Sequence, residues 1–466
     1  MKALAVSQGV VVGARIVTCA LALACATYSD KLREAHESIA DGDLASGARH
    51  LNRVLDVHRN EDVPTKLDSE RSLALLERGM VFHAAGMFGL SARDFGIADK
   101  QLELLDIARD GAGKIGQYIY SDSAAKYKTS PTEKLSLNAF NLLNYLVRGD
   151  LSGARVEAKR FTVMRNYLRD YDSEHAHGAF GSYMAGFVFE RLGQADEALR
   201  YYDEALQERE LASLAGPIAH LAQRGTYRSE RLAAYVPPAI TSPSASPAKD
   251  AATSQSDGIA SSAELLVVIS TGRVPFKIPR RIPIGVAVGL AGTYITGDPR
   301  VLEHSMFKVV VYPDLVAAQD VFDRATWSVD GREMPIELVT DLASELVAEY
   351  QRLVPKIIAA ALTRMIVRAA AAEGARAAGR QSEGAGALIG FLAAAAVEGT
   401  LVALDRPDTR SWTTLPAQVH VGRIQVPPGH HDVNVELVGP RGRERRRFDV
   451  NVPPGGFAVL DVTTLR

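Results

Sequence analysis

Apolar residues recur at intervals of three and four positions through residues 28–235, and proline is scarce over the same stretch. This spacing brings the apolar side chains onto one face of a helix. Each such face must be buried against a neighbouring element. The pattern therefore predicts that residues 28–235 fold as a succession of amphipathic helices.

From residue 263 onward the pattern changes. Residues 265–269 (LLVVI) and 307–312 (FKVVVY) are short apolar runs of the kind found in strands. Residues 342–357 return to helical spacing, with a kink expected at Pro355. After residue 415, short segments alternate between apolar and polar positions, which indicates strands with one buried face. We expect a mixed α/β region that ends in a small antiparallel β-sandwich.

Residues 236–262 separate the two patterns. They contain four prolines among many Ser, Ala and Thr residues, a composition that is typical of a linker because it cannot bury a core. The chain is thus expected to be an α+β protein of several domains. The expected boundaries are 1–24 for a signal peptide, 25–235 for helical repeats, 236–262 for the linker, 263–414 for a mixed α/β domain with long alanine-rich helices, and 415–466 for the sandwich.

One segment of the helical region matches the tetratricopeptide pattern, in which two helices cross at small residues around an aromatic side chain. Its residues are Gly186, Gly193, Ala198, Tyr202 and Ala205. Glycine at the turn tolerates a left-handed backbone, and the alanines keep the second helix slim. The same frame recurs at Gly79, Gly86, Ser91, Phe95 and Ala98, at Gly149, Ala154, Ala158 and Phe161, and at Gly42, Gly47, Leu51 and Val54. Four matches predict a tetratricopeptide-like helical solenoid, whereas a lone match would also fit an ordinary helical hairpin.

The N-terminus has the character of an export signal. Two basic residues precede residues 16–24, an apolar stretch too short for a membrane span. The sequence ALAC at 22–25 resembles the lipobox of bacterial lipoproteins, in which the cysteine is acylated and becomes the mature N-terminus. The resemblance implies a lipid on Cys25, and Ala26 in place of aspartate resembles lipoproteins of the outer membrane. A plain secretory signal and an uncleaved anchor are the alternatives.

Composition removes several classes of function. With 53 Lys and Arg against 55 Asp and Glu, the formal charge is −2, and no global field points to nucleic acid. Both cysteines, Cys19 and Cys25, lie at the N-terminus. A disulfide framework or a thiolate metal site in the folded body is therefore excluded.

Sequence motifs give no catalytic site. Residues 109–118 (RDGAGKIGQY) lack the glycine and the hydroxyl residue that a phosphate loop needs around its Gly-Lys pair. The pairs His175 with His177 and His430 with His431 have no obvious third metal ligand, so we expect them in solvated loops or turns. We expect no cofactor, no metal and no enzymatic activity, although a carboxylate pair of the glycosidase kind would leave no signature.

Two stretches near residue 400 are candidates for contact with a membrane or with another molecule. Residues 384–404 have the length of a membrane span, but Glu398 would be costly in hydrocarbon, which favours a helix buried against the sheet over membrane contact. The residues that follow form a candidate interaction patch, because arginine and tryptophan are common interface anchors. They are Asp405, Arg406, Asp408, Arg410 and Trp412. A structural ion-pair cluster is the other interpretation of these residues.

Four stretches together, residues 22–25, 142–160, 270–285 and 405–429, resemble a family of bacterial envelope lipoproteins with N-terminal tetratricopeptide-like repeats. The resemblance implies work in the cell envelope and carries no established chemistry. We expect an outer-membrane lipoprotein that faces the periplasm and acts as a scaffold in envelope assembly or maintenance. Its repeat groove would bind a periplasmic or membrane protein, since stacked helical pairs form a long concave surface. A peptidoglycan-binding C-terminal module and an unrecognised hydrolase are the alternatives.

Overall fold

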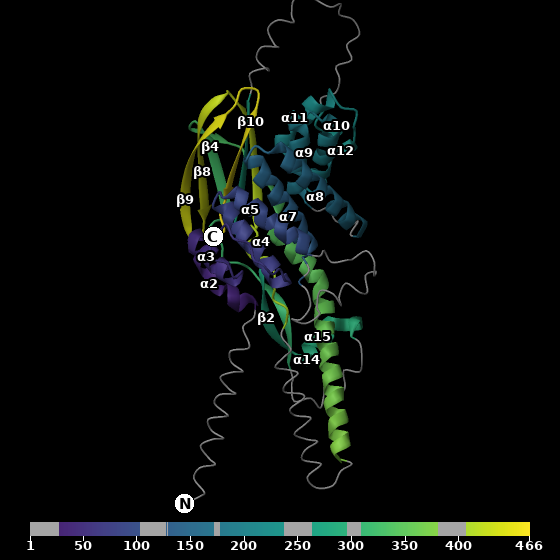
Figure 1. The fold of residues 1–466 in the computed structure, drawn as a ribbon. Helices are drawn as coiled ribbons and strands as arrows, with labels where there is room; N and C mark the ends of the chain where they lie inside the picture. The colour runs from purple at the N-terminus through teal and green to yellow at the C-terminus, as the bar shows by residue number, and fades with distance from the viewer. Residues whose placement is uncertain are drawn as a thin grey trace, which may run out of the picture.

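The computed structural model describes residues 28–102, 127, 129–171, 178–236, 263–295, 309–380 and 407–466. It is a mixed helical and sheet protein with helices in the N-terminal part and sheets in the C-terminal part, as the sequence predicts. The helices form a layer beside the sheets, and a long helix and a strand pair project from one end of this body (Figure 1). The predicted signal peptide and most of the predicted linker lie outside the described residues.

Eight helices of the N-terminal part form four antiparallel hairpins, each made of two consecutive helices. They are α2 (Tyr28–Ala40) with α3 (Leu44–Val54), α4 (Ser69–Ala84) with α5 (Phe88–Gln101), α7 (Pro131–Val147) with α8 (Leu151–Tyr171), and α9 (Ala179–Arg191) with α10 (Ala195–Ala205). Three short elements follow, η1 (Ala212–Leu214), α11 (Ala215–Ala222) and α12 (Glu230–Ala233).

The four hairpins share one turn. Gly42, Gly86, Gly149 and Gly193 each follow the first helix of a pair, with φ between 71° and 87°. Residues with a Cβ rarely adopt this left-handed backbone, so glycine is what allows the chain to reverse here. These four residues are the turn glycines that the repeat frame predicts.

The helix crossings also follow the frame. A Cβ atom at Gly186 would lie 2.4 Å from the Tyr202 ring, and one at Gly79 would lie 2.7 Å from the Phe95 ring, so only glycine admits these rings. Ala198 is fully buried. The turn glycines are unevenly spaced along the chain, however, whereas tetratricopeptide units repeat about every 34 residues. The structure thus shows four helical hairpins of one design and does not show a tetratricopeptide solenoid.

The C-terminal part contains two four-stranded sheets packed face to face. The first has the order β10 (Phe457–Thr463), β1 (Ala263–Thr271), β7 (Gln418–Val426), β6 (Glu337–Asp341). The second has the order β5 (Arg332–Met334), β4 (Arg324–Val329), β8 (Gly429–Gly439), β9 (Gly442–Val452). Apolar side chains from both sheets, including Trp327, Val433 and Val435, form a core between them.

Strand β1 corrects the expected boundary at residue 415. This strand lies inside the first sheet, antiparallel to β7 and parallel to β10. The sandwich therefore includes residues 263–271 and is not an antiparallel module of residues 415–466 alone. The reason is that β1 is buried at all nine positions, and a strand buried on both faces needs a place in the middle of a sheet with cover on each side.

The helical layer provides the cover on the outer face of the first sheet (Figure 1). Leu266 and Val268 of β1 belong to the same buried cluster as the helices, while Leu265 and Val267 point into the core between the sheets. Phe187 of α9 packs edge-on against Phe457 of β10, with ring centroids 5.3 Å apart. Helices and sheets are thus one body with a continuous core.

A projecting arm extends from this body (Figure 1). It consists of the antiparallel pair β2 (Phe276–Pro283) and β3 (Val309–Val316), the helix α14 (Ile284–Ala291), the turn η2 (Gly292–Tyr294) and the long helix α15 (Leu342–Arg380). α15 continues through Pro355 and does not end there. The arm has its own small apolar cluster, in which Val310 of β3 and Ile358 and Leu362 of α15 are fully buried.

Candidate interaction site

The segment that precedes β7 is held against the helical layer by a buried glutamate of α4. The Glu77 carboxylate accepts hydrogen bonds from the backbone N–H groups of Thr413 and Thr414, at 2.8 and 2.9 Å, and from the Thr413 hydroxyl at 2.9 Å. Glu77 is fully buried, and burial raises its pKa to about 6. A carboxylate that accepts three hydrogen bonds fixes the position of the backbone that donates them.

A second helix glutamate acts on the preceding residue. Glu133, in the first turn of α7, accepts from the backbone N–H of Trp412 at 2.9 Å and from the Tyr127 hydroxyl at 2.6 Å. It also completes a capping box with Ser130. Two glutamates on different helices therefore bind three consecutive backbone N–H groups of the segment 412–414.

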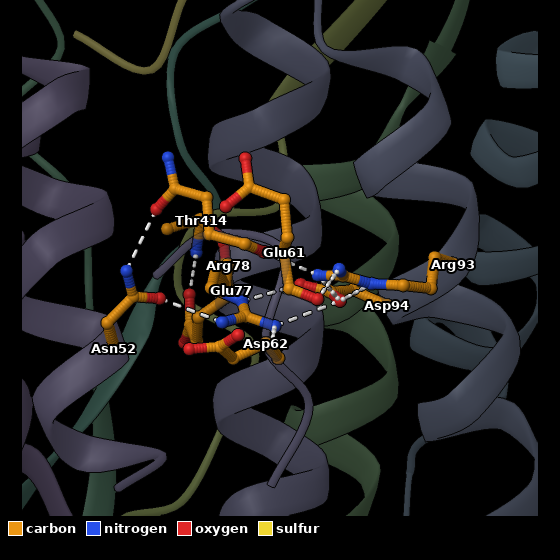
Figure 2. A network of polar contacts seen from close by, with 9 residues as sticks. Asn52, Glu61, Asp62, Glu77, Arg78, Arg93, Asp94 and Thr414 are labelled. Atoms are coloured by element: carbon orange, nitrogen blue, oxygen red, sulfur yellow. Dashed lines mark hydrogen bonds and ion pairs between the residues drawn. The ribbon is translucent and has the colours of Figure 1, made fainter. Parts of the chain in front are cut away.

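An ion-pair network lies beside Glu77 (Figure 2). Arg78 donates to Asp94 at 2.6 Å and to Asn52 at 2.7 Å, and the Arg78 and Asp94 side chains are wholly shielded from solvent. Arg93 also donates to Asp94, at 2.7 Å. These contacts join α3, α4 and α5. Because Arg78 and Arg93 both pair with the buried Asp94, the network is a structural one.

Arg423 of β7 joins the sheet to the helical layer at its other end. It donates to Glu264 of β1 at 2.6 Å, to Glu190 of α9 at 2.7 Å and to the Tyr202 hydroxyl at 2.9 Å. Its guanidinium also lies over the Phe187 ring, 5.0 Å from the centroid. The tyrosine that the repeat frame predicts as a plug between helical pairs thus binds the sheet through its hydroxyl.

A buried histidine joins α4 to the edge strand β10. His83 lies 3.2 Å from the Asp461 carboxylate, and both side chains are inaccessible to solvent. Burial acts to lower the pKa of His83, but Asp461 and Asn144 outweigh it, so that the pKa is raised above its ordinary value. The contact between His83 and Asp461 therefore ties the helical layer to the last strand.

The candidate patch does not form a surface anchor. Trp412 is fully buried and packs edge-on against Phe95, with ring centroids 5.6 Å apart. Asp408 and Arg410 bind each other at 2.7 Å, which fits the structural ion-pair interpretation. Asp405 and Arg406 lie outside the described residues, as do Cys25 and residues 384–404.

The first two hairpins enclose an open, charged cleft with a volume of about 590 Å³. Its walls come from α2, α3 and α4, and they carry charges of both signs. The charged lining residues are Asp30, Lys31, Arg33, Glu34, Arg53, Asp68, Glu70 and Arg71. Exposed ion pairs bridge it, among them Lys31 with Glu70 at 2.5 Å and Arg53 with Glu34 at 3.3 Å. Such pairs contribute little stability, so a ligand with complementary charges is able to replace them.

A second hollow, of about 60 Å³, lies where the arm meets the body. Glu133, Glu349 and Lys277 line it, and burial together with the Glu133 carboxylate raises the pKa of Glu349 to about 7. The volume admits a few water molecules but is well below the 300 Å³ or more that small-molecule sites usually have. A carboxylate pair is thus present, but the hollow has no room for a sugar ring.

The histidine pairs considered as metal ligands show no metal-binding arrangement where the structure describes them. His430 lies 3.0 Å from Asp449, and His431 lies 2.7 Å from Asp330, while His175 and His177 are outside the described ranges. Among the residues that the structure covers, no group of three or more His, Cys, Asp and Glu side chains is arranged to hold a metal ion. None of the helices described is both long and apolar enough to cross a membrane.

Glu77, Glu133 and Arg423 were missed at the sequence level. No motif marks them, since glutamate is a common helix residue and arginine a common strand residue on exposed faces. The one available signal is that Glu77 and Arg78 interrupt an apolar run, residues 73–82 (LALLERGMVF). A charged pair inside such a run indicates buried charges that need partners.

Comparison with models of protein families, with curated proteins and with solved structures gives no match to this chain. The resemblance to envelope lipoproteins stays a prediction from sequence.

Proposed function

We propose that this protein is a lipid-anchored scaffold of the bacterial cell envelope that binds a protein partner at the charged cleft between α2, α3 and α4. The predicted lipid on Cys25 supplies the anchor, and the body supplies the binding surface. The observation that carries this function is the cleft itself, about 590 Å³ in volume and open to solvent on the first two hairpins.

The position of the cleft follows from what the rest of the helical layer does. On their sheet-facing side, the hairpins bind β1, β7, β10 and the segment 412–414 of the same chain. That side of the hairpins is occupied by the chain's own strands. The cleft on the first two hairpins is a different surface, and its charges are half exposed or more at Arg53 and Glu34.

The chemistry of the cleft favours a polypeptide that carries both charges. Cationic and anionic side chains alternate around it, and few apolar residues line it besides Val54. Complementary charges set specificity and association rate more than affinity. A scaffold that holds partners reversibly fits such a surface.

The test is site-specific crosslinking in cells. A photoreactive residue in place of Arg33, which is exposed at the cleft, is expected to capture a partner. The same residue in place of Val163, which is 70% exposed on α8, is the matched control. Arg53→Glu should reduce capture at position 33, because it reverses a charge of the cleft. Equal capture at both positions, or no capture at position 33, would contradict the proposed function.

A further inference from the structure

Helix α14 has no polar side chain. Its sequence is Ile-Gly-Val-Ala-Val-Gly-Leu-Ala, residues 284–291. Ala287 and Ala291 are buried against the arm, with Ile284 and Val288 packed beside them. The opposite face of the helix therefore consists of glycine and large apolar residues only.

That opposite face is open to solvent. Val286 is 50% exposed, Leu290 is 47% exposed, and Tyr294 in the following turn is 53% exposed. Val286 and Leu290 are four positions apart, so they lie side by side on one face of the helix. A helix in contact with water normally carries polar residues on its outer face. This one does not, which indicates that another apolar phase covers it.

Exposed apolar side chains are concentrated in the arm. The described residues include ten large apolar side chains that are strongly exposed, and six of them belong to the arm. These six are Ile278, Val286, Leu290, Tyr294, Val309 and Val316. A soluble surface rarely gathers so many in one projection unless the projection is an interaction site.

The charged residues of the arm are mostly cations, in contrast to the net charge of −2 for the whole chain. In the strands, α14 and residues 350–366 of α15 there are six cationic side chains, Lys277, Arg280, Arg281, Arg352, Lys356 and Arg364. The one acidic side chain in these segments is Asp314, which pairs with Arg280 at 2.6 Å. Glu345 and Glu349 lie at the start of α15, where it meets the body.

At Lys356 and Tyr294 a positive charge lies next to the exposed apolar surface of the arm. The Lys356 ammonium lies 5.6 Å from the centroid of the Tyr294 ring, beside the apolar face of α14. Lysine and tyrosine next to apolar side chains are typical of protein surfaces at the headgroup level of a bilayer, because each has an apolar body and a polar tip.

We infer that the arm docks on the surface of an anionic lipid bilayer, with α14 inserting its Val286 and Leu290 side chains among the acyl chains. An eight-residue helix is too short to span a membrane, but it can lie in the interface. The exposed cations Arg280 and Arg281 add attraction to the negative headgroups. The side chains of α14 contain no hydrogen-bonding group. Acyl chains are suited to cover this helix because they require none.

The base of the arm is also where the described chain begins. The Ser29 hydroxyl in the first turn of α2 lies 3.0 Å from the Thr409 hydroxyl. The neighbouring Asp408 lines a small hollow together with Lys277 of β2 and Ile357 of α15. A lipid on the preceding Cys25 would therefore hold the same end of the molecule at the membrane.

Vesicle flotation tests the contact without the lipid, so that its outcome is separate from that of the crosslinking at the cleft. The mature chain, residues 25–466 with Cys25→Ser, contains every residue that the structure describes. It is expected to float with phosphatidylethanolamine–phosphatidylglycerol vesicles and to bind phosphatidylcholine vesicles more weakly. Val286→Asp with Leu290→Asp should weaken binding at least about tenfold, a change of 1.4 kcal/mol.

The matched control is Val156→Asp with Val163→Asp, two exposed valines on one face of α8. It introduces the same charges and should leave vesicle binding unchanged. Arg280→Gln with Arg281→Gln should lower binding to anionic vesicles and reduce its dependence on salt.

A fluorescence measurement guards against loss of folding in the aspartate variants. Both natural tryptophans, Trp327 and Trp412, are buried and give a constant background. Leu290→Trp should shift its emission to shorter wavelength when anionic vesicles are added, whereas Val163→Trp should not. Failure of the parent chain to bind vesicles, or equal binding by the α14 variant, would overturn the membrane contact. Self-association that Val286→Asp abolishes, in a chain that ignores vesicles, would assign the face to a second copy instead.

Discussion

The body and the arm use the same kinds of residues in opposite ways. In the body, Arg423 is buried and pairs with Glu190 and Glu264. In the arm, Arg280 pairs with Asp314 at the same 2.6 Å, but its side chain is 60% exposed. Apolar side chains show the reverse, since six of the ten exposed large ones among the described residues belong to the arm. The difference shows that sequence composition alone does not tell which charges hold a fold together.

The comparison has an energetic basis. A buried charge that loses its partner remains in a low-dielectric environment, and the cost of removing one partner is about 3–5 kcal/mol. An exposed pair in water contributes about 0–1 kcal/mol. The body should therefore be sensitive to single charge substitutions, and the arm should tolerate them.

The largest effect is expected at Arg423. Arg423→Met leaves Glu190 and Glu264 buried without their main cation, and it should lower the free energy of unfolding by about 3–5 kcal/mol. Urea denaturation followed by circular dichroism measures this. A loss below about 1 kcal/mol would mean that the helix–sheet contact does not depend on this charge.

The next effect concerns pH at the junction of body and arm. Burial raises the folded-state pKa of Glu349 to about 7, above the value of about 4.3 for an unfolded chain. A raised carboxyl pKa favours the protonated folded state, so this contribution to stability is present at low pH and is lost as pH rises toward 7. Glu349→Gln removes the charge and should stabilise the protein by about 3–4 kcal/mol at pH 8.

The same substitution should have little effect at pH 4, where Glu349 is protonated in both states. Denaturation midpoints of the two chains at pH 4, 6 and 8 test this. Equal midpoints at all three values would show that Glu349 is solvated and that the hollow beside it is open.

A smaller loss is expected from overpacking the best-matched hairpin. Ala198 is fully buried where α10 crosses α9, and Ala198→Leu should cost about 1–3 kcal/mol. Because helices and sheets share one core, calorimetry should show a single transition that moves as a whole. Two separate transitions would support independent domains joined by a linker.

The smallest effect is expected in the arm. Arg280→Met removes the cation from an exposed pair and should change the free energy of unfolding by at most about 1 kcal/mol. It is the matched partner of Arg423→Met, because the substitution and the donor–acceptor distance are the same. Comparable losses from both variants would remove the distinction between body and arm.

The four hairpins were predictable because their signals are local. The apolar period gives each helix, and a glycine such as Gly193 gives each reversal, with φ of 71°. Both signals lie within about twenty residues of chain and do not depend on what packs against them. The uneven spacing of the four turn glycines is also present in the sequence. It can be compared with the tetratricopeptide repeat length only when the helix ends are known.

The sheet topology and the clamp on segment 412–414 were not predictable in this way. β1 reads as a buried strand from its composition, but nothing in residues 263–271 identifies β10 as its parallel neighbour. Glu77 and Glu133 bind backbone N–H groups more than two hundred residues away, and backbone groups carry no sequence signal. The sequence left two interpretations of Trp412 open, because a tryptophan looks alike whether its pocket lies in a partner or in its own chain.

The pairing of β1 with β10 has a consequence for how the protein is made. Within the sandwich, β1 is the first strand to be synthesised and β10 the last, and parallel pairing over such a separation is slow to form. The first sheet therefore stays incomplete until β10 is available to pair with β1. A prematurely terminated product would lack β10 and the buried Leu465, and would present the edge of β1 to proteases and other chains. The burial of β1 thus depends on a partner strand that lies far away from it in the sequence.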